Sequence, residues 1–234
     1  QLILTRDNTL SSQIQPLEYK PGIEKCLNPG RQEVMFQHME RIKEFFINSY
    51  HEAMDWCRGK NWVLRMPLLI YFTYVLTRHL ADPMYESLIG ALNLGIHELG
   101  HYVFRPFGEF MHAAGGTILQ CLAPVFSMIM FRRLRDYFAI AACFGWLSTN
   151  LFSVATYVAD ARAMKLKLVT PGGGVAQHDW NYLLFKLGLL HVDTTLALLI
   201  RITACASMLI CLAGGACLLW QMAHPAEPDK LSTL

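Results

Sequence analysis

Charged residues are scarce in this chain: Asp, Glu, Lys and Arg make up 16% of its 234 residues, whereas soluble domains carry about 25%. With 53% hydrophobic residues, the composition excludes a disordered or collagen-like chain and argues against a water-soluble globule. The formal net charge of +2 gives no support for a nucleic-acid partner. Seven scattered cysteines without a CxxC pair exclude a disulfide framework and a zinc ribbon.

Long apolar runs occupy most of the chain after its first quarter. A bilayer core about 30 Å thick requires about 20 apolar residues in a helix. Three runs meet this length without any charge, at residues 113–131, 137–158 and 202–220. Two further candidates are residues 62–80, with arginines near both ends, and residues 85–104. We therefore predict an all-α, multi-pass integral membrane protein with about five transmembrane helices.

The N-terminal quarter of the chain is more polar and is predicted to lie outside the membrane or at its surface. Between about residues 31 and 58, apolar residues recur at helical spacing, which indicates an amphipathic helix on the membrane surface or on the bundle. A soluble helix of a further domain is the alternative. The predicted organisation is an N-terminal segment (1–61), a transmembrane domain (62–220) and a C-terminal tail (221–234). Because the chain begins at Gln1 rather than at a methionine, we expect it to be processed or truncated.

Five spans would divide the connecting segments between two sides of the membrane. The N-terminal region, the turn at residues 105–111 and the long loop at residues 160–191 would share one side. The short loops at residues 78–84 and 131–136 would share the other. A weak majority of basic residues near the span ends favours the first side as cytoplasmic.

One motif carries metal chemistry: the H-E-x-x-H sequence His97-Glu98-Leu99-Gly100-His101. On a helix, His97 and His101 project from one face, so their imidazoles can bind one metal ion. Glu98 lies close enough to accept a proton from a metal-bound water without being a ligand. Ionisable residues are costly within an apolar segment and mark a functional site. The motif therefore predicts a Zn²⁺ site with Glu98 as the catalytic base.

A zinc site needs a third protein ligand, and two candidates lie on the expected side. Asp160 ends a polar stripe that begins at Asn150, so its carboxylate has a rigid platform. His178 follows a triple glycine and is the better generic zinc donor. Both have structural readings as well: Asp160 can pair with Arg162, and the pair His178-Asp179 can cap a following helix. If neither binds the metal, His112 and Glu109 are the next candidates.

The motif within a transmembrane helix resembles the site-2 protease group of intramembrane zinc metalloproteases. The run Ala113-Ala114-Gly115-Gly116 is similar to that family's helix-packing segment, and Asn150 followed by Asp160 is similar to its aspartate-bearing segment. The resemblance covers about residues 85–162 and implies zinc-dependent hydrolysis of peptide bonds at or near the membrane surface. It also implies His97 and His101 as ligands and Asp160 as the third. The chain departs from the family because no glycine follows Asp160 and no PDZ-like region is present.

Two other classes remain open from the sequence. Glu98-x-x-His101 and Glu109-x-x-His112 are parts of a di-iron carboxylate site, which would also need two glutamates on other helices. Alternatively, the chain is a non-catalytic subunit of a membrane assembly that retains a metalloprotease-like fold and its metal. The expected partners are the lipid bilayer and either a membrane-spanning substrate or a larger membrane complex.

Overall fold

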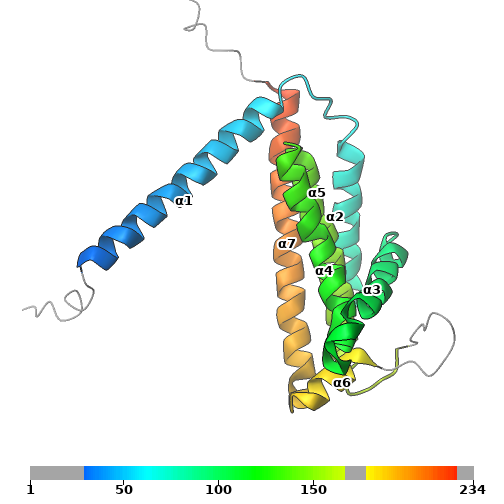
Figure 1. Ribbon diagram of the computed structural model, residues 1–234. Helices are drawn as coiled ribbons and strands as arrows, with labels where there is room; N and C mark the ends of the chain where they lie inside the picture. The colour runs from blue at the N-terminus through cyan, green and yellow to red at the C-terminus, as the bar shows by residue number, and fades with distance from the viewer. Residues whose placement is uncertain (1–28, 167–177, 226–234) are drawn as a thin grey trace, which may run out of the picture. The chain divides into compact units, whose positions relative to one another are not determined.

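The computed structural model describes residues 29–166 and 178–225, and within these ranges the chain is helical and contains no strand (Figure 1). Seven α-helices follow one another: α1 (Pro29–Trp56), α2 (Met66–Ala81), α3 (Gly90–Phe104), α4 (Glu109–Arg133), α5 (Tyr137–Ala159), α6 (Asp179–Lys186) and α7 (Asp193–Ala223). Short 3₁₀ turns, η2 (Arg105–Phe107) and η3 (Leu190–Val192), precede α4 and α7. The all-α prediction is confirmed.

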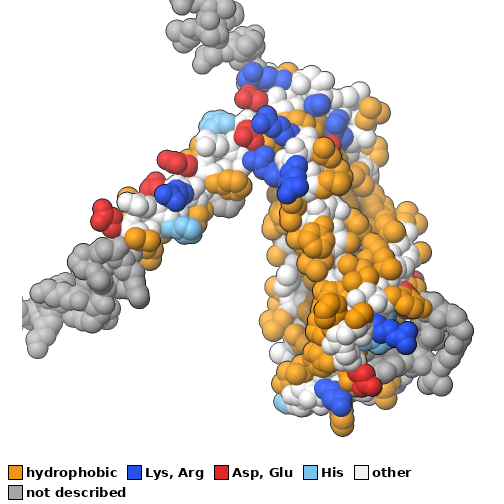
Figure 2. Space-filling view, in the orientation of Figure 1, with side chains coloured by type: hydrophobic (Ala, Val, Ile, Leu, Met, Phe, Trp, Pro, Cys, Tyr) orange, Lys and Arg blue, Asp and Glu red, His pale blue; other side chains and the backbone are white. Residues whose placement is uncertain are grey.

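Three of the helical segments are long and apolar enough to cross a membrane: α4, α5 and the continuous stretch Leu190–Ala223. They contain the three uncharged runs that the sequence analysis identified. The other two predicted spans also form helices, but α2 has 16 residues and α3 has 15, fewer than the roughly 20 that a full crossing requires. On the face shown in Figure 2, hydrophobic side chains cover the sides of the bundle and charged side chains gather toward its ends.

The chain divides into two compact units, residues 1–49 and residues 50–234. In the first unit, α1 exposes most of its large apolar side chains, namely Val34, Met35, Phe36, Met39, Ile42, Phe45 and Ile47. In the second unit, the end of α1 packs into a core cluster: Ala53 and Cys57 are buried with Tyr137 and Leu218. The helix predicted near residues 31–58 is therefore present.

Helices α5 and α7 form the centre of the second unit. Small buried residues allow them to lie close together, and Ala155 and Ala204 are both completely buried. Two serine hydroxyls join the helices: Ser148 donates to the Ala204 carbonyl oxygen (2.7 Å) and Ser207 donates to the Phe144 carbonyl oxygen (2.8 Å). Each hydroxyl satisfies its own donor on a neighbouring helix, as a buried polar group must.

Helix α3 does not run the length of the bundle as the five-span arrangement predicts. It begins beside the middle of α5, where Trp146 donates to Asn93 and Asn93 donates to Thr149. The segment before it lies beside the last turn of α5, because Thr156 donates to the carbonyl oxygen of Pro83 (2.7 Å). The prediction that loop 78–84 shares an end with loop 131–136 is therefore wrong. A hydropathy pattern predicts which residues form helices, but it does not predict at what level along the bundle a short helix begins.

Candidate metal centre

The H-E-x-x-H motif lies on α3, as predicted, and brings three potential ligands together. The candidate ligand atoms of His97, Glu98 and His101 all lie within 4.8 Å of one another. The two imidazole rings are 4.9 Å apart between centroids, in an edge-to-face arrangement. His97 is buried, whereas Glu98 and His101 are half-buried. These three side chains form a group that could hold a metal ion.

Glycines let α3 and α4 approach closely enough to enclose His97. A Cβ atom at Gly100 would collide with the backbone of Gly115, so the two helices touch backbone to backbone there. A Cβ atom at Gly116 would lie 2.5 Å from His97 Nε2. The imidazole of His97 thus occupies the space that any larger residue at position 116 would fill. The small-residue run on α4 acts as a packing device, as expected, and also forms one wall of the site.

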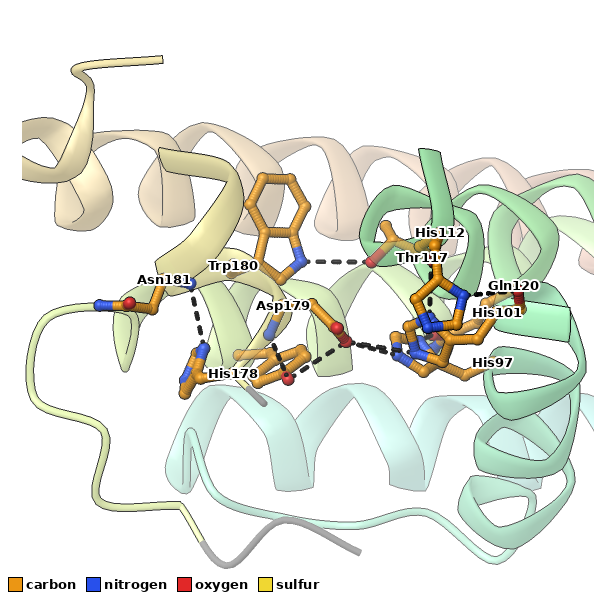
Figure 3. Close-up of polar contacts among 10 residues, drawn as sticks. His97, His101, His112, Thr117, Gln120, His178, Asp179, Trp180 and Asn181 are labelled. Carbon is orange, nitrogen blue, oxygen red and sulfur yellow. Dashed lines mark hydrogen bonds and ion pairs between the residues drawn. The ribbon is translucent and has the colours of Figure 1, made fainter. Parts of the chain in front are cut away.

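A residue that the sequence analysis treats only as part of a helix cap completes the cluster. Asp179, the first residue of α6, is buried, and its Oδ2 lies 3.3 Å from His97 Nε2. The same oxygen lies 3.3 Å from His101 Nε2. Figure 3 shows the carboxylate pointing from α6 toward both imidazoles. Two imidazole nitrogens of α3 therefore lie 3.3 Å from one carboxylate oxygen of α6.

The hydrogen bonds of the two Nδ1 atoms, which face away from Asp179, show where each imidazole carries a proton. His97 Nδ1 lies 2.9 Å from Gln120 Oε1, and His101 Nδ1 lies 2.7 Å from the carbonyl oxygen of His112. Both partners are carbonyl oxygens and can only accept a hydrogen bond, so Nδ1 carries a proton in each ring. In the neutral rings, both Nε2 atoms then carry a lone pair. Both lone pairs face Asp179.

When both rings are neutral, the cluster therefore brings electron-pair donors together with no proton between them. Burial raises the pKa of Asp179, but its hydrogen bonds with His101 and His97 outweigh that effect and lower the pKa to about 2. The carboxylate is thus ionised at neutral pH. A carboxylate oxygen at 3.3 Å from two imidazole nitrogens is stable there only if a cation lies among the three atoms or if the imidazoles take up protons. This donor set fits a metal ion.

Hydrogen bonds of Asp179 and the two residues after it hold α6 against α4 and the C-terminal end of α5. The Tyr157 hydroxyl accepts a hydrogen bond from the Asp179 backbone N–H (3.0 Å) and lies 3.3 Å from its Oδ2. Trp180 Nε1 donates to the Thr117 hydroxyl (3.2 Å), and Asn181 donates to the carbonyl oxygen of Ala161 (2.8 Å). These bonds hold the carboxylate opposite the histidines, as a metal ligand requires.

The structure brings the two predicted third ligands, Asp160 and His178, to each other. Asp160 accepts the backbone N–H groups of Lys165 (3.0 Å) and Leu166 (2.9 Å), and its Oδ2 lies 3.4 Å from His178 Nε2. Burial raises the pKa of Asp160, but the backbone hydrogen bonds and His178 lower it below its usual value. His178 Nδ1 accepts the backbone N–H of Asn181, so both ring nitrogens face neighbouring groups. His178 thereby caps α6, as one of the sequence-based interpretations expects.

Three residues of the site are missing from the ligand set that the sequence predicts. Asp179 enters the sequence analysis only as part of a cap, although an acid beside a histidine also suits a metal. Tyr157 is merely one member of the polar stripe on α5. Gln120 is not singled out at all, yet it is the only strongly polar side chain in the run 113–131, and such residues within a span usually have a specific partner.

Comparisons with protein-family models, with curated proteins and with solved structures give no match.

Proposed function

We propose that the chain is a membrane-embedded zinc peptidase whose metal is held by His97, His101 and Asp179. The observation that carries the proposal is the position of Asp179 Oδ2, which lies 3.3 Å from His97 Nε2 and 3.3 Å from His101 Nε2. Ligand atoms around a tetrahedral zinc ion, with bonds of about 2.0–2.1 Å, lie about 3.3–3.4 Å apart. Two histidines, one carboxylate and an open fourth position are typical of catalytic zinc sites. In this proposal, Asp179 takes the role that the sequence analysis gives to Asp160 or His178.

Glu98 suits the role of general base. Its carboxylate is half-buried and lies within 4.8 Å of the ligand atoms of both histidines, on the same helix. Bound zinc would supply a water whose pKa is near 7. Glu98 would accept the proton of that water as it attacks a peptide carbonyl, and would then donate it to the departing amine. Partial exposure of Glu98 leaves this side of the cluster open to water.

The surroundings support a membrane location for this chemistry. α4 and α5 flank the site and are both long and apolar enough to cross a membrane. The histidines lie on a helix that begins beside the middle of α5, so the substrate bond would be cleaved near one membrane surface. A polypeptide that spans or enters the bilayer is the substrate class that such a site can reach. The bilayer and this substrate are the proposed partners.

The first test is the metal content of the full chain, purified in detergent without chelator and analysed by mass spectrometry. We expect about one zinc ion per chain, lost in His97→Ala and in His101→Ala and retained in Glu98→Gln. A zinc-free parent protein would overturn the proposal.

The second test separates hydrolysis from binding. The parent and Glu98→Gln are reconstituted in liposomes with a set of single-span membrane proteins, and cleavage products are identified by mass spectrometry. We expect products from the parent alone, because the amide of Gln cannot accept a proton from water. Equal cleavage by both proteins would refute Glu98 as the base. A zinc-loaded parent that cleaves nothing would instead favour the non-catalytic subunit of a membrane assembly.

A further inference from the structure

Two buried amide side chains lie behind the metal centre, where apolar residues would be expected. Gln120 on α4 is 5% exposed and Asn150 on α5 is completely buried. Gln120 Nε2 donates to Asn150 Oδ1 (3.2 Å), and Asn150 Nδ2 donates to the backbone carbonyl oxygen of Gln120 (2.8 Å). Burying an amide is unfavourable unless its groups are paired. The two amides satisfy each other, and Gln120 Oε1 remains to accept from His97.

The orientation of both amides is fixed by the backbone carbonyl group of Gln120, which cannot rotate. A backbone carbonyl oxygen only accepts, so the Asn150 amide must turn its nitrogen toward the Gln120 backbone. Its oxygen then faces the Gln120 side chain, which must present its own nitrogen there. Gln120 Oε1 is thereby turned toward His97 Nδ1. Reversing either amide would set oxygen against oxygen or nitrogen against nitrogen inside the bundle.

We propose that Asn150 and Gln120 are positioning residues that set the tautomer of His97. Together they hold the proton on Nδ1 and keep the Nε2 lone pair facing Asp179. Asn150 acts two hydrogen bonds away from the imidazole and has both ends of its amide bound to Gln120. The effect on metal affinity rests on the proposed function, whereas the tautomer is a property of the metal-free chain.

His101 shows why His97 needs such an arrangement. The Nδ1 of His101 donates directly to the backbone carbonyl oxygen of His112, close to the start of α4, where the chain returns beside α3. His97 instead faces the interior of α4, where backbone carbonyl oxygens are engaged in the helix, except that of Gln120, which Pro124 leaves without a helical donor and which accepts from Asn150. A side-chain oxygen must therefore replace the backbone one. Since a side-chain amide can rotate so that its oxygen and nitrogen exchange places, it needs a second residue to fix its direction.

Three variants and one control test the proposal in the full chain. Gln120→Met keeps the length of the side chain and removes the acceptor, and Asn150→Leu removes the group that orients Gln120. Gln120→Glu retains an acceptor for the proton on His97 Nδ1. Ser148→Ala is the matched control, because Ser148 is also buried on α5 but donates to the Ala204 carbonyl oxygen. Size-exclusion chromatography and thermal unfolding confirm that each variant folds.

The first measurement is the imidazole tautomer of metal-free protein at alkaline pH, where the rings are neutral, read from ¹⁵N NMR with His97 assigned by its loss in His97→Gln. The second is zinc affinity, measured by competition with a chelator. We expect the Nδ1–H form in the parent, in Gln120→Glu and in Ser148→Ala. We expect mixed tautomers in Gln120→Met and Asn150→Leu, with zinc binding weakened about 10–100-fold, the range typical of residues that orient a ligand.

The outcomes separate this inference from the proposed function. If folded Gln120→Met and Asn150→Leu keep the parent's tautomer and affinity, the inference is wrong, whether or not zinc binds. If the tautomer changes as expected but the parent binds no zinc, the proposed function fails while the positioning role stands. If Asn150→Leu does not fold, the comparison of tautomer and zinc affinity between Gln120→Met and Gln120→Glu tests the inference, because the two variants differ in whether an acceptor faces His97.

Discussion

Two polar clusters lie toward opposite ends of the α4–α5 hairpin, and they differ in whether each acceptor faces a donor. Near the turn between these helices, Arg132 donates to Glu52 (3.0 Å) and to the Tyr137 hydroxyl (2.9 Å). The Tyr137 hydroxyl in turn donates to Glu52 (2.6 Å). Each of these acceptors faces a proton on its partner. This arrangement, hereafter the arginine cluster, is complete as it stands and joins the end of α1 to the hairpin.

The metal centre lies toward the other end of the same two helices and is not complete in this sense. Its two Nδ1 protons are directed outward, to Gln120 and to the backbone of His112, so that the inward-facing atoms are all acceptors. Folding brings Asp179 Oδ2 to 3.3 Å from the Nε2 atoms of His97 and His101. A purely structural cluster would pair each acceptor with a donor. The comparison shows how a structural polar group differs from a binding site. The first balances its own protons, and the second needs a cation from outside or additional protons on its imidazoles.

The largest expected effect comes from removing the carboxylate that distinguishes the metal centre. We expect Asp179→Ala to weaken zinc binding by more than about 100-fold, beyond the 10–100-fold typical of residues that only orient a ligand. Asp160→Ala and His178→Ala are the comparison variants, because these residues bind each other and backbone groups around α6. Zinc titrations against a chelator measure all three. If His178→Ala or Asp160→Ala releases the metal and Asp179→Ala does not, the third ligand is the one predicted from the sequence.

The second expectation is that zinc stabilises the folded chain through the metal centre alone. A ligand that binds only the native state adds about 2.7 kcal/mol to the free energy of unfolding at 100 times its Kd. Thermal unfolding in detergent, with and without zinc, measures this increment. We expect the increment to persist in Glu52→Gln and to disappear in His97→Ala. An increment that survives in His97→Ala would place the stabilising zinc elsewhere.

The third expectation concerns the wall that α4 presents to His97. A methyl group at position 116 would lie 2.5 Å from the imidazole, so Gly116→Ala should displace the ring and weaken zinc binding at least about 10-fold. Gly214→Ala on α7 is the matched control, because its Cβ would meet its nearest neighbour, Ala141, only at 4.0 Å. Zinc affinity is measured for both. An unchanged affinity in Gly116→Ala would show that the ring can move without loss of binding geometry.

The sequence predicts the parts of this molecule that depend on local pattern. Uncharged runs long enough to cross a bilayer locate α4, α5 and α7, and the spacing of His97 and His101 places two imidazoles on one helical face. Two whole helices, α4 and α5, separate His101 from Asp179, and nothing in that interval indicates which acid on α5 or α6 folds back onto α3. Asp160 directly follows α5 but accepts the backbone N–H groups of Lys165 and Leu166. Pattern identifies the donor types, whereas the hydrogen-bond network decides which donors meet.

The smallest expected effect lies in the arginine cluster and has a defined pH dependence. Hydrogen bonds from Tyr137 and then from Arg132 lower the pKa of Glu52 below its usual value. A carboxyl group with a lowered pKa in the folded state stabilises the protein above its unfolded pKa, and this contribution is lost as the pH falls toward the folded pKa. Glu52→Gln should therefore be slightly less stable than the parent at neutral pH, and the difference should shrink with acidification through the range where glutamate protonates. Because the Glu52 and Arg132 side chains are partly exposed to solvent, salt should also reduce the difference. Thermal unfolding of both proteins across pH measures this difference in stability, with a chelator present so that the metal centre does not contribute. A difference that grows toward acid would contradict the ionised state of Glu52.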